Sequence, residues 1–256
     1  MRFLALGAAA GAALLITAGA ALAEPTEITV RAISKDAKFI GSTMGGVRIT
    51  LHDVETGELL ASGVTAGSTG DTKRLVEQPR KRGTPLSDPK SAKFTATLDL
   101  DRPRLVEVKA HGPLAQRQSA ITVSSTQWVV PGKHVTGGDA WMLEMPGFVV
   151  DVLAPPAHVK IKGAPQKISL KANVTMMCGC PIEPGGKWDA KTYEVAALLT
   201  RNGKPAKTVP LAYAGKKSQF AAELEVKEKG VYEATVYAYD PANGNTGLDR
   251  VTFIIN

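Results

Sequence analysis

The sequence predicts an all-β protein in which two antiparallel β-sandwich domains follow a signal peptide. Three observations support this prediction. Short runs of alternating apolar and polar residues, the period of a half-buried strand, occur along nearly the whole chain. No segment after the first 23 residues has a convincing amphipathic helical pattern. About 233 residues remain beyond those 23, which exceeds the roughly 100 to 150 residues typical of one domain.

Residues 1–23 have the three parts of a secretory signal peptide. Arg2 supplies a positive charge, a long apolar run follows, and Ala-Leu-Ala precedes Glu24, so we expect cleavage after Ala23. The two cysteines stand far from this cut, which disfavours a lipoprotein anchor. No later apolar run approaches the roughly 18 residues of a membrane-spanning helix. The mature protein is therefore expected to be periplasmic or secreted, without a membrane span.

The first domain is predicted to cover residues 24–146. In residues 47–60, apolar residues at odd positions alternate with polar ones and a Glu-Thr-Gly-Glu turn follows, which indicates a hairpin with one wet face. The same alternation returns in residues 94–100 and 104–112. Residues 66–93 are rich in Gly, Pro and charge and show little periodicity, so they are predicted to form a long surface loop.

Glycines and prolines from about residue 131 onward predict a linker, with the domain boundary near Pro146. Beyond that boundary, several short alternating strands at regular spacing are typical of an antiparallel sandwich. We therefore predict a second domain over residues 147–256. This domain carries both cysteines of the chain, Cys178 and Cys180.

The segment GVYEATVYAYDPANGNTG, residues 230–247, resembles the late hairpin of bacterial immunoglobulin-like domains. Tyr232 stands near the strand start, at the tyrosine-corner position of that fold, and Ala234, Val236 and Ala238 follow it on one face. The resemblance covers roughly the last hundred residues and implies an immunoglobulin-like sandwich. No cysteine occurs two residues after Tyr232, so the inter-sheet disulfide of antibody domains is absent. The first domain resembles transthyretin-like or other immunoglobulin-like sandwiches more loosely, and neither resemblance implies a function.

Both cysteines lie at the end of the strand predicted in KISLKANVTMMCGC. The alternation places Cys178 on the core side with Met176, and Cys180 continues that face if the chain stays extended. Extended residues two apart have α carbons ~6.6 Å apart and parallel side chains, which leaves the β carbons too far apart for a disulfide. A disulfide therefore requires Gly179 to bend the chain sharply, which glycine permits. A shared metal ion requires a smaller change of the backbone, because two sulfurs bound to one ion can lie ~4 Å apart.

Soft ligands around these cysteines favour Cu(I) over harder ions, because thiolate and thioether together select Cu(I). The predicted ligands of Cu(I) or a similar soft metal are Cys178, Cys180, Met177 and Met176. Met177 is expected to be freer to turn toward the metal, since the alternation points it away from the core. A second methionine pair, Met142 and Met145, lies in the predicted linker, and the sequence leaves its role open.

Three functions remain open from the sequence. The combination Met-Met-Cys-Gly-Cys in an exported chain favours metal binding for storage, transfer or sensing. The alternatives are a CGC thiol–disulfide redox protein and a structural or accessory immunoglobulin-like protein that binds a partner protein. No HExxH, GxSxG or phosphate-loop motif occurs, so we expect no enzyme. The formal charge of +7 is spread along the chain, with one cluster at residues 80–82, which predicts a solvated loop and no nucleic-acid site.

Overall fold

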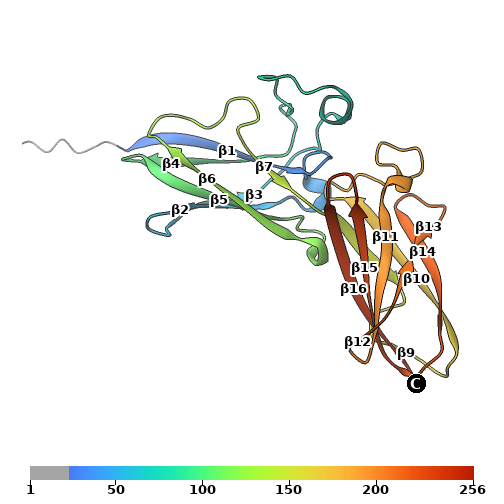
Figure 1. Ribbon diagram of the computed structural model, residues 1–256. Coiled ribbons are helices and arrows are strands. Elements are labelled where there is room, and N and C mark those ends of the chain that lie inside the picture. The colour runs from blue at the N-terminus through green and yellow to red at the C-terminus, as the bar shows by residue number, and fades with distance from the viewer. Residues whose placement is uncertain (1–22) are drawn as a thin grey trace, which may run out of the picture.

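The computed structural model describes residues 23–256, so the predicted signal peptide over 1–23 lies outside the described residues except for Ala23. Figure 1 shows two sandwiches that follow one another along the chain and meet at an angle. The fold class is all-β, as the alternation predicted. The strands are β1 (Glu24–Ser34), β2 (Arg48–Asp53), β3 (Leu59–Val64), β4 (Phe94–Leu100), β5 (Arg104–Gly112), β6 (Ile121–Val129), β7 (Trp141–Met145), β8 (Phe148–Ala154), β9 (Val159–Ile161), β10 (Gln166–Met176), β11 (Glu194–Arg201), β12 (Lys204–Pro210), β13 (Ala212–Tyr213), β14 (Gln219–Val226), β15 (Gly230–Asp240) and β16 (Asn245–Ile255).

Helical structure in this part of the chain is limited to single turns. These turns are η1 (Ser42–Met44), η2 (Lys73–Glu77), η3 (Arg117–Ser119) and η4 (Ala190–Thr192). None of the helical segments among residues 23–256 is long and apolar enough to span a bilayer.

The N-terminal sandwich consists of a sheet with strand order β4-β1-β7 and a sheet with order β3-β2-β5-β6. Alternation along the strands turns apolar residues inward. In β2, for example, Ile49 and Leu51 are fully buried, whereas Arg48 is exposed. The inner faces of the two sheets enclose one hydrophobic core, to which β1 contributes Val30 and β5 contributes Val108.

Residues 141–145, which the sequence placed in a linker, form strand β7 instead. β7 pairs in parallel with β1, and Met145 is fully buried in the N-terminal core. Met142 packs beside a smaller cluster of buried residues around Phe39. A parallel pair joins segments that lie far apart in the chain, so local turn signals gave no indication of it.

The loop over residues 66–93 contains no strand and only the single turn η2. The buried Arg31 of β1 holds the C-terminal end of this loop in place. The Nη1 atom of Arg31 donates hydrogen bonds to the carbonyl oxygens of Ser91, at 2.7 Å, and Ala92, at 3.1 Å. Burial lowers the pKa of Arg31, and the nearby carboxylate of Asp139 acts in the opposite direction.

The C-terminal sandwich packs a sheet of order β13-β14-β10-β8 against a sheet of order β12-β11-β15-β16-β9. The hydroxyl of Tyr232, near the start of β15, donates a hydrogen bond to the carbonyl oxygen of Glu228 at 2.8 Å. This is the geometry of a tyrosine corner, and it confirms the immunoglobulin-like resemblance of the sequence. The Tyr232 ring also stacks on Phe253 of β16, with ring centroids 5.3 Å apart.

The two sandwiches are joined by the short link between β7 and β8, and further contacts hold the junction. The indole Nε1 of Trp188 donates to the carbonyl oxygen of Asp36 at 2.9 Å. Lys187 forms an ion pair with Glu77 of η2, at 2.7 Å. The strands up to β7 thus belong to one pair of sheets and those from β8 onward to the other. Whether residues 147–256 fold alone stays a prediction.

Candidate functional site

The Met-Met-Cys-Gly-Cys segment forms a tight turn at the end of β10. The amide of Gly179 donates to the carbonyl oxygen of Met176 at 2.8 Å, and the amide of Met176 donates to the carbonyl oxygen of Cys180 at 3.1 Å. Gly179 has a φ of +78°, a left-handed conformation that glycine adopts without steric cost. The α carbons of Cys178 and Cys180 lie 5.5 Å apart, and the two cysteines form a disulfide. Gly179 therefore makes the sharp bend that was expected to be necessary for a disulfide between Cys178 and Cys180.

The structure divides the predicted metal ligands between two hydrophobic cores. Met176, Cys178 and Cys180 are buried in the core of the C-terminal sandwich. Met177 is fully buried in the core of the N-terminal sandwich, so the expectation that it turns freely toward the cysteines is wrong. The alternation does point Met177 away from the C-terminal core. The N-terminal sandwich, rather than water, covers that side of the strand.

Met44 of η1 covers the outer side of the same turn. Its Sδ lies 2.6 Å from the position that a β carbon on Gly179 would occupy. A residue with a side chain at position 179 would therefore meet both a strained φ and a blocked space. The turn thus forms part of the contact between the two sandwiches.

Cu(I) binding at this turn stays a prediction. Both cysteines are paired, and among residues 23–256 no group of three or more His, Cys, Asp or Glu side chains has an arrangement that suits a metal ion. The disulfide would have to be reduced first, because thiolates are the metal ligands. Of the four predicted ligands, Cys178, Cys180 and Met176 share a core and Met177 does not.

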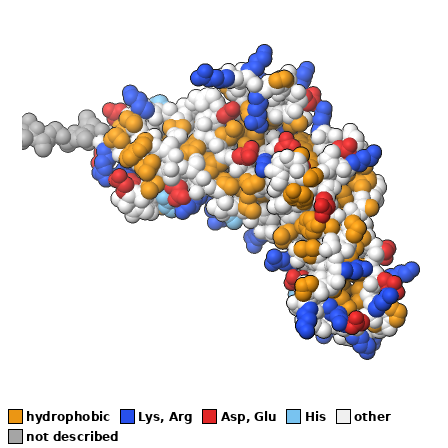
Figure 2. Space-filling model, in the orientation of Figure 1, with side chains coloured by type: hydrophobic (Ala, Val, Ile, Leu, Met, Phe, Trp, Pro, Cys, Tyr) orange, Lys and Arg blue, Asp and Glu red, His pale blue; other side chains and the backbone are white. Residues whose placement is uncertain are grey.

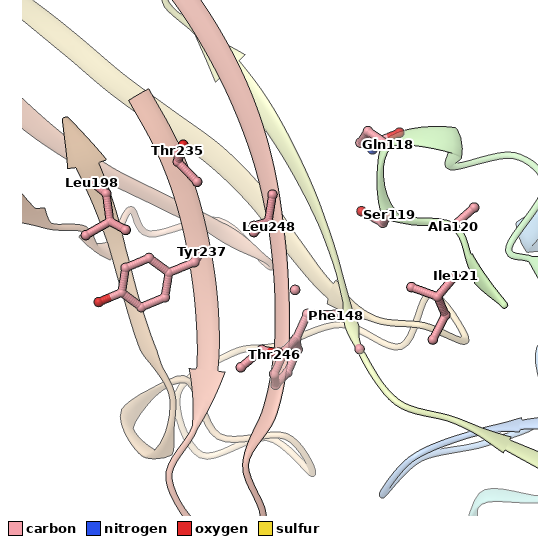
Figure 3. Close-up of a pocket in the computed structure, with 12 residues that line it drawn as sticks. Gln118, Ser119, Ala120, Ile121, Phe148, Leu198, Thr235, Tyr237, Thr246 and Leu248 are labelled. Carbon is pink, nitrogen blue, oxygen red and sulfur yellow. The ribbon is translucent and has the colours of Figure 1, made fainter. Parts of the chain in front are cut away.

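A groove of about 580 Å³ lies where the two sandwiches meet (Figure 3). The outer face of β11, β15 and β16 forms its floor, and the start of β8 lies at its base. The turn η3 and the start of β6, from the N-terminal sandwich, form the opposite wall. The residues that line the groove are Gln118, Ser119, Ala120, Ile121, Gly147, Phe148, Leu198, Thr235, Tyr237, Thr246, Gly247 and Leu248.

Apolar side chains stand exposed on the floor of this groove. The strand register places Leu198 opposite Thr235, and Tyr237 opposite Leu248. Leu198 is 48% exposed and Leu248 is 42% exposed. In Figure 3, Ile121 points toward the groove from the opposite wall. Figure 2 shows hydrophobic side chains gathered over this sheet near the junction.

Hydrogen bonds fix the walls of the groove. The amide of Val150 in β8 donates to the hydroxyl of Ser119 at 3.1 Å, and the Nε2 of Gln118 donates to the carbonyl oxygen of Val150 at 3.1 Å. At the base, the side-chain amide of Asn245 bonds to the backbone of Gly147. The groove is therefore formed before any ligand arrives, as is usual for binding sites.

The polar side chains that line the groove carry amide and hydroxyl groups. The lining contains no charged side chain and no His or Cys. The hydroxyl of Tyr237 donates to the carboxylate of Glu194, and this hydrogen bond, with burial as a second cause, raises the pKa of Tyr237 to about 12. Behind the floor, burial raises the pKa of Asp151, and the nearby Asp249 raises it further.

This groove was not predicted from the sequence. Its signal was present in the strands, since Leu198 and Leu248 occupy positions that the alternation turns toward water. A single apolar residue on the wet face of a strand is common and is not informative by itself. The two leucines indicate a groove only when the strand register places them on one floor. The opposite wall comes from a distant segment in the N-terminal sandwich.

No family model matches the chain, and no curated protein matches it. Similar solved structures include an engineered protein, 16% identical over 50% of this chain and 24% of that chain, with a TM-score of 0.32. Another is the set of fibronectin(III)-like modules of CbhA from Clostridium thermocellum, 12% identical over 90% of both chains with a TM-score of 0.30. A third is a DUF3823 family protein from Bacteroides uniformis, 13% identical over 91% of this chain and 100% of that chain with a TM-score of 0.27. The chain thus spans about a quarter of the engineered protein, 24%. At these TM-scores none of the likenesses bears on function.

Proposed function

We propose that this chain is an exported, non-enzymatic accessory protein that holds a partner protein in the groove between its two sandwiches. The observation that carries the proposal is the exposure of Leu198 and Leu248 on either side of Tyr237 on the groove floor. Exposed apolar side chains that gather in one groove favour an interaction site.

The composition of the groove supports binding of another protein. Five of the twelve lining residues carry apolar side chains, and Gln118, Thr235 and Thr246 add hydrogen-bonding groups among them. This mixture is typical of a site that recognises a ligand by shape and apolar contact, with polar groups fixing its orientation. The fixed walls reduce the entropy that the protein loses on binding.

Export is supported by two features. The signal-peptide pattern of residues 1–23 is one. The disulfide between Cys178 and Cys180 is the other, because disulfides persist in the periplasm and outside cells and are rare in the reducing cytosol. Both features favour an accessory function in an oxidising compartment.

Site-specific photo-crosslinking in cells that export the protein tests the proposal. A photoreactive amino acid at Leu198 places the reactive group on the groove floor. The same amino acid at Val231 is the matched control, because Val231 lies on β15, is 49% exposed and does not line the groove. We expect a discrete protein adduct from position 198 and none from position 231. Equal adducts from both positions, or none from either, would overturn the proposal.

Soft-metal binding is a second candidate function, favoured by the grouping of Met176, Cys178 and Cys180 in one core. It requires a thiol reductant that delivers two electrons and two protons to the disulfide, after which both thiols deprotonate to bind Cu(I). Competition with a chromophoric chelator under reducing conditions tests it. We expect wild type to withdraw Cu(I) from the chelator, and Cys178→Ser to lose most of this ability. Equal behaviour of the two proteins would contradict metal binding.

A further inference from the structure

A second hollow, of about 360 Å³, opens beside the groove on the N-terminal sandwich. Arg48, His111 and Arg117 line it together with Pro113, Leu114 and Ala120, and no acidic residue does. Ala120 lines both this hollow and the groove, so the two adjoin at that residue. We call this hollow the basic hollow.

Within the part of the chain that the structure describes, the arginines of the basic hollow have no acidic partner. Arg48 and Arg117 are exposed, and among residues 23–256 no carboxylate forms an ion pair with either. His111 contacts the hydroxyl of Thr122 at 2.9 Å. The guanidinium groups therefore remain available for a ligand from outside.

A further cation flanks the groove floor. Arg250 follows Leu248 on the outer face of β16, and the register places it opposite Thr235. Its backbone amide donates to Asp249 at 2.7 Å, and the other carboxylate oxygen of Asp249 accepts from the amide of Val152 at 2.9 Å. Both oxygens of the Asp249 carboxylate therefore accept hydrogen bonds from backbone amides. Cations thus stand both in the basic hollow and on β16, one of the strands of the groove floor.

Resting on the proposed function, we infer that the groove takes an acidic, apolar peptide segment of the partner protein. Apolar side chains of the segment lie on Leu198 and Leu248, and a neighbouring Asp or Glu, or a terminal carboxylate, binds Arg48 and Arg117. Guanidinium and carboxylate match each other geometrically and form charge-assisted hydrogen bonds. The apolar floor and the cations then select different features of one ligand.

A peptide fits this groove better than an acyl chain with an anionic head group. Thr235, Thr246 and Gln118 are distributed among the apolar lining residues. A peptide backbone has amide and carbonyl groups that pair with these side chains. An acyl chain would cover them without forming hydrogen bonds, which costs free energy.

Selection from a displayed library of random ten-residue peptides on the full mature protein tests the inference. Three variants accompany wild type. Arg48→Gln/Arg117→Gln removes the cations, Leu248→Asp disrupts the floor, and Arg80→Gln/Arg82→Gln is the control, because it removes two exposed charges outside the groove lining and the basic hollow. Individual peptides are then titrated by fluorescence anisotropy.

We expect wild type and the control to select peptides that combine apolar residues with Asp or Glu. We expect Arg48→Gln/Arg117→Gln to bind these peptides about threefold to tenfold more weakly and to lose the acidic preference. The inference would be overturned if Arg48→Gln/Arg117→Gln kept the acidic preference, or if wild type selected apolar peptides without that preference. Arg-dependent binding of oleate in place of peptides would also overturn it. In each case the groove would remain a binding site. Selected peptides that bind Leu248→Asp as well as wild type would instead overturn the proposed function.

Discussion

The side-chain amide of Asn245 forms two hydrogen bonds with the backbone of Gly147, at 2.6 Å to the amide and 3.0 Å to the carbonyl oxygen. This pair joins the β15–β16 hairpin to the link between the two sandwiches, at the base of the groove. Met177 lies beside it, with its Sδ 3.1 Å from the position of a β carbon on Gly147. The link, the hairpin and the Met-Met-Cys-Gly-Cys turn therefore meet in one buried region.

Replacing Asn245 with alanine should destabilise this region. The substitution leaves the amide and carbonyl of Gly147 buried without partners, which we expect to lower the free energy of unfolding by about 1–3 kcal/mol. Urea denaturation followed by circular dichroism measures the change. Thr246→Ala is the matched control, since Thr246 is exposed, and its effect should stay within about 0.5 kcal/mol. Equal effects of the two substitutions would show that the Asn245 hydrogen bonds contribute nothing.

The contact between Met44 and Gly179 gives a second prediction, and Gly203 provides its control. Gly179 and Gly203 have nearly the same φ, +78° and +76°, but no atom lies within 4 Å of a β carbon on Gly203. Gly203→Ala therefore measures backbone strain alone, about 1 kcal/mol. Gly179→Ala should cost at least about 1 kcal/mol more, because the new methyl group meets the Met44 sulfur.

A double-mutant cycle isolates that steric part. In a Met44→Ala background, the cost of Gly179→Ala should fall toward that of Gly203→Ala, as measured by urea denaturation. A cost of Gly179→Ala that is the same with and without Met44 would exclude a close contact between the two sandwiches at this turn.

Thiol counting tests the disulfide. Protein isolated from the exporting compartment and denatured without reductant should show no reactive thiol, whereas reduction should release both Cys178 and Cys180. Because the bond closes a very short loop, its reduction should lower the free energy of unfolding by only about 1–2 kcal/mol. Two titratable thiols in the unreduced sample would contradict the disulfide and strengthen the case for a metal site.

The titration of Tyr237 tests the geometry at one side of the groove floor. The hydrogen bond to Glu194 raises the pKa of Tyr237 to about 12, so the phenol should stay protonated at pH 11. Since the folded-state pKa exceeds the ordinary value of about 10, the stabilisation is complete below pH ~10 and is lost as the pH rises through 12.

Ultraviolet difference titration of wild type against Tyr237→Phe measures this pKa. Glu194→Gln should bring it down toward the ordinary value, because the charged acceptor is removed. An unchanged pKa in Glu194→Gln would mean that the hydrogen bond does not hold the phenol.

Local patterns in the sequence were sufficient to predict the fold class and many of the strands. The alternation in residues 47–51 and 94–100 reflects burial of one strand face, which any sandwich imposes. The same alternation correctly placed Met176 and Cys178 in one core. Tyr232 could be recognised because a tyrosine corner involves residues only four apart, Tyr232 and Glu228.

Contacts between distant segments could not be predicted in this way. Met177 was expected to turn freely because the pattern of one strand shows only which side is apolar, not what covers the other side. Strand β7 was interpreted as a linker because its partner β1 lies far away in the chain. The groove escaped notice for the same reason, since Ile121 and Leu248 face it from different sandwiches.

A comparison of affinities tests whether the groove binds a partner protein. The protein captured by crosslinking at Leu198 is titrated against wild type, Leu248→Asp and Val231→Asp, after unchanged melting temperatures show that the variants are folded. Both substitutions place a carboxylate on an exposed apolar position of the same sheet, but only Leu248 lines the groove. We predict that Leu248→Asp weakens binding at least about tenfold, or about 1.4 kcal/mol, and that Val231→Asp leaves it unchanged. Equal binding by wild type and Leu248→Asp would show that the groove does not bind the partner.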